Sequence, residues 1–108
     1  MITVTAQQPQ PTRSHPRVDA GFMVKMHTNG RSVVAKAQDL SMAGLMLVGD
    51  FRDAEETVTL AIPLPDDREI VIRALVRRRE EDELGLEFDQ LDWDDIIALA
   101  RYLHPRLP

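Results

Sequence analysis

The stretch VDAGFMVKMHTNGRSVVAKAQ, residues 18–38, decides the fold because it carries a complete hairpin signal. Every second residue over 18–26 is apolar, and this period of two predicts a half-buried β-strand. Asn29 and Gly30 follow, and this pair tolerates the positive φ angles of a tight hairpin turn. Alternation resumes over about 32–38, which predicts an antiparallel return strand.

Further short strands are predicted by the same alternation after this hairpin. They cover about 45–48, 57–62, 69–78 and 84–88. Pro63 and Pro65 are expected to end the strand that begins at Thr57, because proline cannot donate to a β-ladder. The chain therefore contains six predicted strands with connections of hairpin length.

The end of the chain changes to a helical period. Asp92 is a good N-cap, and the acidic residues just after it suit the positive end of a helix dipole. The apolar positions expected to share its buried face are Trp93, Ile96, Ile97, Ala100 and Leu103. Pro105 is expected to stop the helix near His104. The predicted fold class is mostly β: a six-stranded antiparallel β-barrel with a C-terminal α-helix across its mouth.

Length and composition indicate an ordinary soluble domain. The chain has 108 residues, of which 44% are hydrophobic and 29% charged, and no apolar run approaches the ~20 residues of a membrane span. No secretory signal is recognisable, so a cytoplasmic location is expected. The absence of cysteine excludes disulfides, thiolate catalysis and cysteine-based zinc sites.

The charge is unevenly distributed along the chain. The net charge is −5, which argues against a nonspecific DNA or RNA binder. Residues 1–49 nevertheless carry five basic against two acidic residues, whereas residues 50–108 carry eight against sixteen. A small anion would therefore bind the N-terminal half.

Two polar elements in that half form the candidate binding site. Arg13 and Arg17 are four residues apart. Arg13 lies in a segment without periodicity that extends to residue 16, and Arg17 directly follows it. Asp39, Ser41 and Gly44 follow the second strand in the pattern Asp-x-Ser-x-x-Gly. Arginine binds phosphate or the O6/N7 edge of guanine bidentately, and a carboxylate can accept from guanine nitrogens. These residue types suit a guanine nucleotide.

With these motifs the chain resembles the PilZ domain family, the bacterial receptor module for cyclic di-GMP. The family pattern is Arg-x-x-x-Arg in an N-terminal arm, then Asp/Asn-x-Ser-x-x-Gly after two strands, and both are present in order. Gly85-Leu86-Glu87-Phe88 also matches a strand common in the family. The resemblance implies a flexible N-terminal arm over 1–11, a PilZ domain over 12–104 and a C-terminal tail over 105–108.

Carried over residue by residue, the resemblance assigns roles to the motif. Arg13 and Arg17 would clamp phosphate and the guanine edge, and Asp39 would accept from a guanine. Ser41 would touch phosphate, and Gly44 would allow close approach. Many relatives have a further arginine before the first motif arginine, where this chain has Thr12. Whether one cyclic di-GMP or an intercalated pair binds is therefore open.

Other charged and polar residues have simpler interpretations. The run Arg77-Arg78-Arg79 precedes four acidic residues and is interpreted as a solvated surface hairpin with mutual screening. His15, His27 and His104 lack metal-ligand spacing, and no Ser-His-Asp set suggests a nucleophile. Neither a metal, a cofactor nor enzymatic activity is expected.

The resulting hypothesis is a cyclic di-GMP receptor that relays the signal to an unidentified downstream protein when the ligand orders the N-terminal arm. The main alternative is a ligand-independent PilZ-like protein–protein interaction module. A small nucleic-acid-binding barrel is disfavoured by the acidic charge and by few aromatic residues for stacking. No membrane partner is expected.

Overall fold

The structure is a computed structural model that describes residues 16–64 and 68–106. Within these two ranges, seven strands precede one α-helix. They are β1 (Val18–Asp19), β2 (Met23–Thr28), β3 (Arg31–Leu40), β4 (Gly44–Val48), β5 (Thr57–Leu64), β6 (Arg68–Arg79) and β7 (Glu83–Asp89). Helix α1 (Trp93–Leu103) follows and continues into the 3-10 turn η2 (His104–Arg106).

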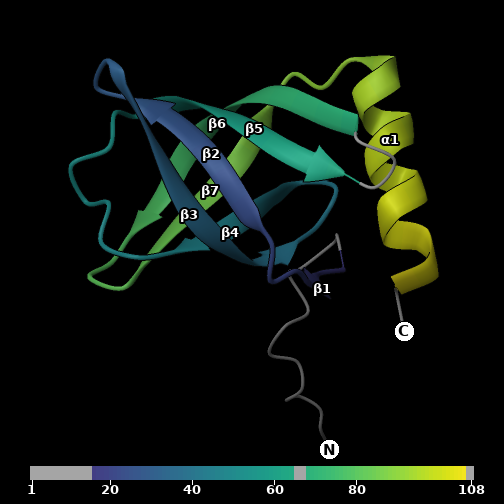
Figure 1. Cartoon of the computed structure of the whole chain (residues 1–108), viewed down its shortest axis with the longest axis horizontal. Coiled ribbons are helices and arrows are strands. Elements are labelled where there is room, and N and C mark those ends of the chain that lie inside the picture. The colour runs from purple at the N-terminus through teal and green to yellow at the C-terminus, as the bar shows by residue number, and fades with distance from the viewer. Residues whose placement is uncertain (1–15, 65–67, 107–108) are drawn as a thin grey trace, which may run out of the picture.

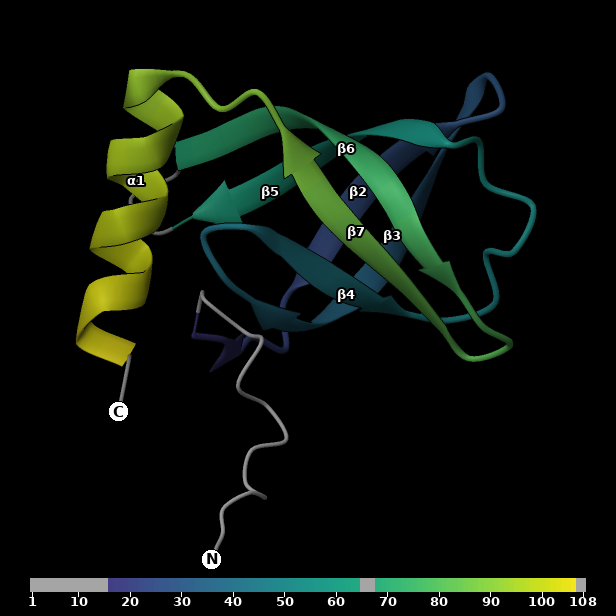
Figure 2. The same ribbon diagram turned by 180° about the vertical axis from the view of Figure 1, so that it is seen from behind.

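Six of the strands, β2 to β7, form a closed antiparallel barrel. The sheet order is β1-β3-β2-β5-β6-β7-β4, and an additional β3–β4 pairing closes it. Figure 1 shows the strands arranged around a central axis, with α1 across one end of the barrel. The view from behind shows β4 and β7 on the opposite wall (Figure 2). The predicted barrel with a C-terminal helix is confirmed.

The first predicted strand is divided in two. The backbone of Gly21 has φ +83°, a conformation that L side chains rarely adopt, and it separates β1 from β2. The two-residue β1 pairs with the far end of β3, Val18 with Leu40 and Asp19 with Asp39. The hairpin turn at Asn29 and Gly30 is confirmed, because both residues have positive φ.

The predicted end of the fourth strand at Pro63 is wrong, because β5 continues to Leu64. Pro63 pairs with Glu69 on β6 and is exposed. On its other side, the pairing of β5 with β2 covers only Thr59 to Ala61. Pro63 therefore lies where β5 is a local edge, and its missing N–H removes no ladder hydrogen bond there.

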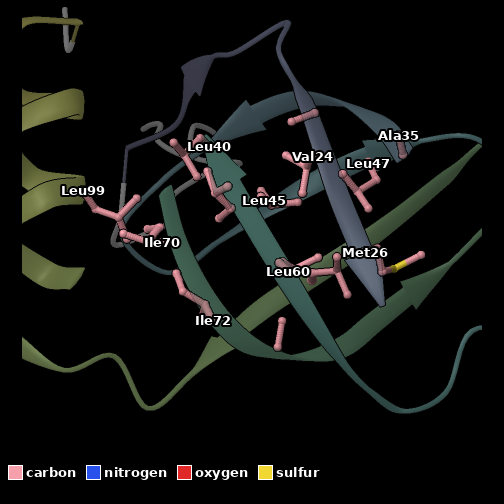
Figure 3. Packing of buried hydrophobic residues seen from close by; sticks show 14 of the residues in the cluster. Val24, Met26, Ala35, Leu40, Leu45, Leu47, Leu60, Ile70, Ile72 and Leu99 are labelled. Atoms are coloured by element: carbon pink, nitrogen blue, oxygen red, sulfur yellow. The ribbon is translucent and has the colours of Figure 1, made fainter. Parts of the chain in front are cut away.

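The barrel interior is filled by the inward side of each strand. Val24, Met26, Leu40, Leu47, Leu60, Ile62 and Leu84 are completely buried. Figure 3 shows labelled side chains of this cluster directed into the barrel, with Leu99 reaching in from α1. The alternating apolar residues of β5, Val58, Leu60 and Ile62, are all buried.

Helix α1 begins as predicted but buries a different face. Asp92 caps it, and the backbone N–H of Asp95 donates to its Oδ1 over 2.9 Å. The buried residues are Ala98, Leu99 and Leu103, whereas Trp93 is 77% exposed and Ile97 45% exposed. The helix carries two apolar stripes, so periodicity alone could not select the one that packs. Of the predicted face, only Leu103 is buried, and Ile96 is half-buried.

Candidate functional site

The turn between β3 and β4 is held by the hydroxyl of Ser41. Ser41 is buried, and its Oγ accepts from the backbone N–H of Ala43 over 3.0 Å and of Gly44 over 3.3 Å. The Ser41 N–H in turn donates to the Gly44 carbonyl over 2.9 Å. A serine with these local bonds replaces backbone partners that a tight turn leaves unpaired. Ser41 therefore fixes the turn that connects the two strands.

Gly44 allows two strands to approach closely. It begins β4 and pairs with Glu87 on β7. A Cβ atom at Gly44 would lie 2.0 Å from the Leu86 carbonyl oxygen and 3.0 Å from the Glu87 Cα. No larger residue fits without moving β7. The close approach that the structure shows at Gly44 is one between β4 and β7.

A β-bulge in β3 places Asp39 on the outside of the barrel. Ala37 pairs with Leu47 and Asp39 with the adjacent Met46, so β3 has one extra residue. Strict alternation from the buried Ala35 and Ala37 would direct Asp39 inward. The extra residue shifts the alternation, so that Leu40 is buried instead.

Asp39 pairs with Arg17, the described arginine of the first motif. Arg17 Nη1 and Asp39 Oδ2 are 3.5 Å apart, and the side chains are 39% and 18% exposed. The other oxygen, Asp39 Oδ1, is buried without a hydrogen-bond partner in the part of the chain that the structure describes. Arg13 lies outside the described residues, as does Thr12. The two motifs meet in the fold through this Arg17–Asp39 pair.

An open-sided pocket of about 450 Å³ lies beside this pair. Its lining residues are Arg17, Ser41, Ala43, Gly44, Leu45, Met46, Arg77, Arg78, Gly85, Leu86 and Glu87. Three predicted site residues, Arg17, Ser41 and Gly44, therefore share one pocket. We call Ser41 and Gly44 the pocket floor. We call the exposed Arg17, Arg77 and Arg78 the pocket rim.

Arg77 and Arg78 were not predicted as site residues, and a second β-bulge explains why both line the pocket. Val76 pairs with Leu86 and Arg78 with the adjacent Gly85, which leaves Arg77 as the extra residue of β6. Without the bulge, Arg78 would continue the inward row that includes Ile72. Both arginine side chains instead lie on the surface, 59% and 55% exposed.

Each rim arginine has a carboxylate partner. Arg77 Nε is 2.5 Å from Glu87 Oε1, and Arg78 contacts Glu80 over 3.2 Å and Glu83 over 3.4 Å. Of the arginine run, only Arg78 pairs with carboxylates of the acidic run that follows it, whereas Arg77 pairs with Glu87. Only Glu87 among these carboxylates lines the pocket, so three guanidiniums face one carboxylate there. The pocket is suited to an anion that accepts several N–H donors.

Metal-binding and membrane-spanning features can be assessed for residues 16–64 and 68–106. Within these ranges, no group of three or more His, Asp or Glu side chains is placed to hold a metal ion. The helices described there are also too short or too polar to cross a bilayer.

Comparison with known proteins identifies the family. The family model described as the PilZ domain matches residues 11–104. No curated protein sequence gives a significant match.

Several solved structures share the fold. The Bacillus subtilis inhibitor of motility (MotI/DgrA) is 25% identical with a TM-score of 0.74, and the match covers 87% of this chain and 50% of that one. This chain thus spans half the length of that protein. The PilZ domain of CeSA from a cellulose-synthesizing bacterium is 17% identical, with a TM-score of 0.69 over 83% of this chain and 96% of that one.

A third similar structure is Borreliella burgdorferi PlzA in complex with c-di-GMP. It is 17% identical with a TM-score of 0.67, and the match covers 86% of this chain and 41% of that chain. The family match extends over most of the sequence and includes both arginine and Asp-x-Ser-x-x-Gly motifs. The chain belongs to the PilZ domain family.

Proposed function

We propose that this chain is a cytoplasmic, non-enzymatic receptor for cyclic di-GMP. The observation that carries the proposal is the pocket in which Arg17 and the Asp-x-Ser-x-x-Gly turn meet. Family membership supports the ligand class, and the similar PlzA structure was determined in complex with c-di-GMP.

The rim and the Arg17–Asp39 pair supply groups that suit the two chemical parts of the ligand. Arg17, with Arg13 from the preceding segment, would bind a phosphate or a guanine O6/N7 edge. Asp39 Oδ1 is an acceptor without a described donor, and a guanine N–H would satisfy it after a small displacement. Arg77 and Arg78 add guanidiniums at the opposite side of the pocket lining.

The role of the floor is indirect in this proposal. The Ser41 hydroxyl already accepts from the Ala43 and Gly44 N–H groups, so its proposed role is to hold the shape of the turn beside the pocket. Gly44 keeps β4 against β7 and thereby keeps rim residues from β6 near Arg17. The floor thus positions the groups that bind.

Calorimetric titration of cyclic di-GMP tests the proposal. The wild type is compared with Arg17→Ala and with Arg73→Ala as a matched control. Arg73 is an exposed arginine on β6 paired with Asp89 over 2.9 Å, and it is not part of the pocket lining. Loss of a charged contact at Arg17 should weaken binding by about 1.5–3 kcal/mol, or roughly 10- to 150-fold.

The control variant and the measured stoichiometry decide how the titration is interpreted. Arg73→Ala should bind within about twofold of the wild type, because an exposed ion pair outside the site contributes little. The measured stoichiometry, one or two ligands per chain, would show whether a chain with Thr12 in place of the further arginine binds one cyclic di-GMP or an intercalated pair. Equal binding by Arg17→Ala and the wild type would contradict the assigned site.

Signal output is proposed to pass to a partner protein through the segment that carries Arg13. Contacts of Arg13 and Arg17 with one ligand would hold this segment against the barrel and create a new surface. Trypsin cleavage after Arg13 should therefore slow when cyclic di-GMP is added to the wild type. Cleavage at the same rate with and without saturating ligand would rule out this relay.

A ligand-independent interaction module is the second candidate function. It is favoured by the exposed apolar side chains of Trp93 and Ile97 on α1. No heat of binding and no thermal shift at ligand concentrations far above micromolar would support this alternative.

A further inference from the structure

Glu87 is a carboxylate inside a pocket otherwise suited to anions. It lies on β7, opposite Gly44 of β4 and Leu75 of β6, and its side chain is 51% exposed. Its Oε1 is 2.5 Å from Arg77 Nε. Guanidinium N–H groups are the donors that would bind phosphate, and this bond already occupies one of them, the Nε–H of Arg77.

A second pair on the same two strands provides an internal comparison. Arg73 of β6 donates from Nε over 3.2 Å and from Nη2 over 2.9 Å to Asp89 Oδ2 on β7. Arg73 and Asp89 are direct partners in the β6–β7 register and are not pocket-lining residues. The strands thus carry one pair inside the pocket and one outside it. Cross-strand stabilisation would explain why each pair forms. It would not explain why one of the two carboxylates, that of Glu87, lies in a pocket lined by three arginines.

We infer that Glu87 is a specificity-determining residue, an internal counter-ion that competes with ligand phosphate for Arg77. This inference rests on the proposed function. A phosphodiester that approaches Arg77 must displace or share the Glu87 contact, and both anions are then close together. The Arg77–Glu87 pair is half-exposed and contributes little to stability, so it can open when a ligand provides better contacts.

The repulsion from Glu87 grows with the charge of the ligand. Cyclic di-GMP has two phosphodiesters, each with one negative charge. Its linear, singly hydrolysed form keeps one diester and gains a terminal phosphate with about 1.5 to 2 negative charges near neutral pH. Glu87 therefore penalises the linear form more than the cyclic form. The pocket would in this way favour the intact messenger over its hydrolysis product.

Parallel titrations of both ligands into the wild type, Glu87→Gln and Asp89→Asn test this inference at one fixed ionic strength. Glu87→Gln keeps the shape of the side chain and removes its charge. We expect it to bind cyclic di-GMP roughly three- to tenfold more tightly, as for one unit charge at about 4 Å in a largely solvated site. Its gain for the linear form should be larger, so that selectivity falls. Asp89→Asn should change neither affinity by more than about twofold.

The outcomes separate this inference from the proposed function. Tighter binding with reduced selectivity in Glu87→Gln alone supports the inference. Binding by the wild type with unchanged or weaker binding by Glu87→Gln overturns the inference and leaves the proposed function intact. Absence of binding by all three proteins, with thermal unfolding transitions that show each is folded, overturns both.

Discussion

The floor and the rim of the pocket are built in opposite ways. The floor residues Ser41 and Gly44 are engaged by backbone: one is bonded to the turn, and the other has no space for a Cβ beside Leu86. The rim residue Arg17, in contrast, contacts a partly exposed carboxylate, that of Asp39, through an ion pair as long as 3.5 Å. Ser41 and Gly44 of the Asp-x-Ser-x-x-Gly motif therefore stabilise the fold, while the rim arginines can exchange their carboxylate partners for a ligand.

The largest expected effect is on the floor. Gly44→Ala places a Cβ 2.0 Å from the Leu86 carbonyl, so β4 and β7 must separate. The free energy of unfolding should fall by about 3 kcal/mol or more, measured by urea denaturation. Gly85→Ala on β7 is the matched control, because its Cβ would lie 3.1 Å from a side-chain atom, the Arg78 Cβ of β6, and not against the backbone. Equal stability of the two variants would contradict the conclusion that Gly44 is required for the packing of β4 against β7.

The next effect is on the rim, and it should appear in affinity alone. Arg77→Ala removes a guanidinium and leaves Glu87 without its partner in the pocket. Binding of cyclic di-GMP should weaken by roughly 10- to 100-fold, while the unfolding midpoint stays near that of the wild type. A large loss of stability without any change in affinity would show that Arg77 belongs to the fold and not to the site.

Ser41→Ala tests whether the floor serves mainly the fold. The variant removes the acceptor of the Ala43 and Gly44 N–H groups. Stability should decrease by about 1–2 kcal/mol, as for a part-buried turn that loses its hydrogen bonds. Ser32→Ala, whose hydroxyl lies at an exposed position beside His27, should lose much less. A strong loss of ligand affinity in Ser41→Ala at unchanged stability would assign Ser41 to direct binding.

The smallest effect is expected away from the pocket, at the start of α1. Burial, followed by the negative charge of Asp92, raises the pKa of Asp95. The folded state therefore holds the proton more tightly than the unfolded state, so this group favours folding at acidic pH and loses that contribution as pH rises through its raised pKa. Asp95→Asn should increase stability at pH 7 by less than about 0.5 kcal/mol and flatten the acid limb. NMR titration of the Asp95 carboxyl would reveal a pKa at or below the ordinary value if this account is wrong.

Local sequence signals were sufficient for most of the fold. Alternation located the strands, Asn29 and Gly30 located a hairpin, and Asp92 marked the start of α1. These signals succeed because each depends on a few neighbouring residues. The buried face of α1 depends on packing against the barrel, which a helix with two apolar stripes does not encode locally.

The site was predictable only in part for a related reason. The two motifs could be read from residue types, and Arg17, Ser41 and Gly44 share the pocket. Arg77 and Arg78 join them because a bulge in β6 turns consecutive residues outward. Bulges depend on the register between strands, and a plain run of arginines contains no such information.

The position of the pocket at the β4–β7 pairing has a consequence for folding and lifetime. The β3–β4 and β6–β7 pairings join strands adjacent in sequence, whereas β4–β7 joins segments distant in sequence, and the barrel is closed only when β4 pairs with both β3 and β7. The pocket draws residues from both strands, so it exists only after the barrel has closed. A bound ligand at about 100 times its Kd would stabilise the closed form by about 2.7 kcal/mol. Amide hydrogen exchange in the paired residues of β4 and β7 would slow accordingly. The lifetime of the closed barrel would then depend on the concentration of the ligand.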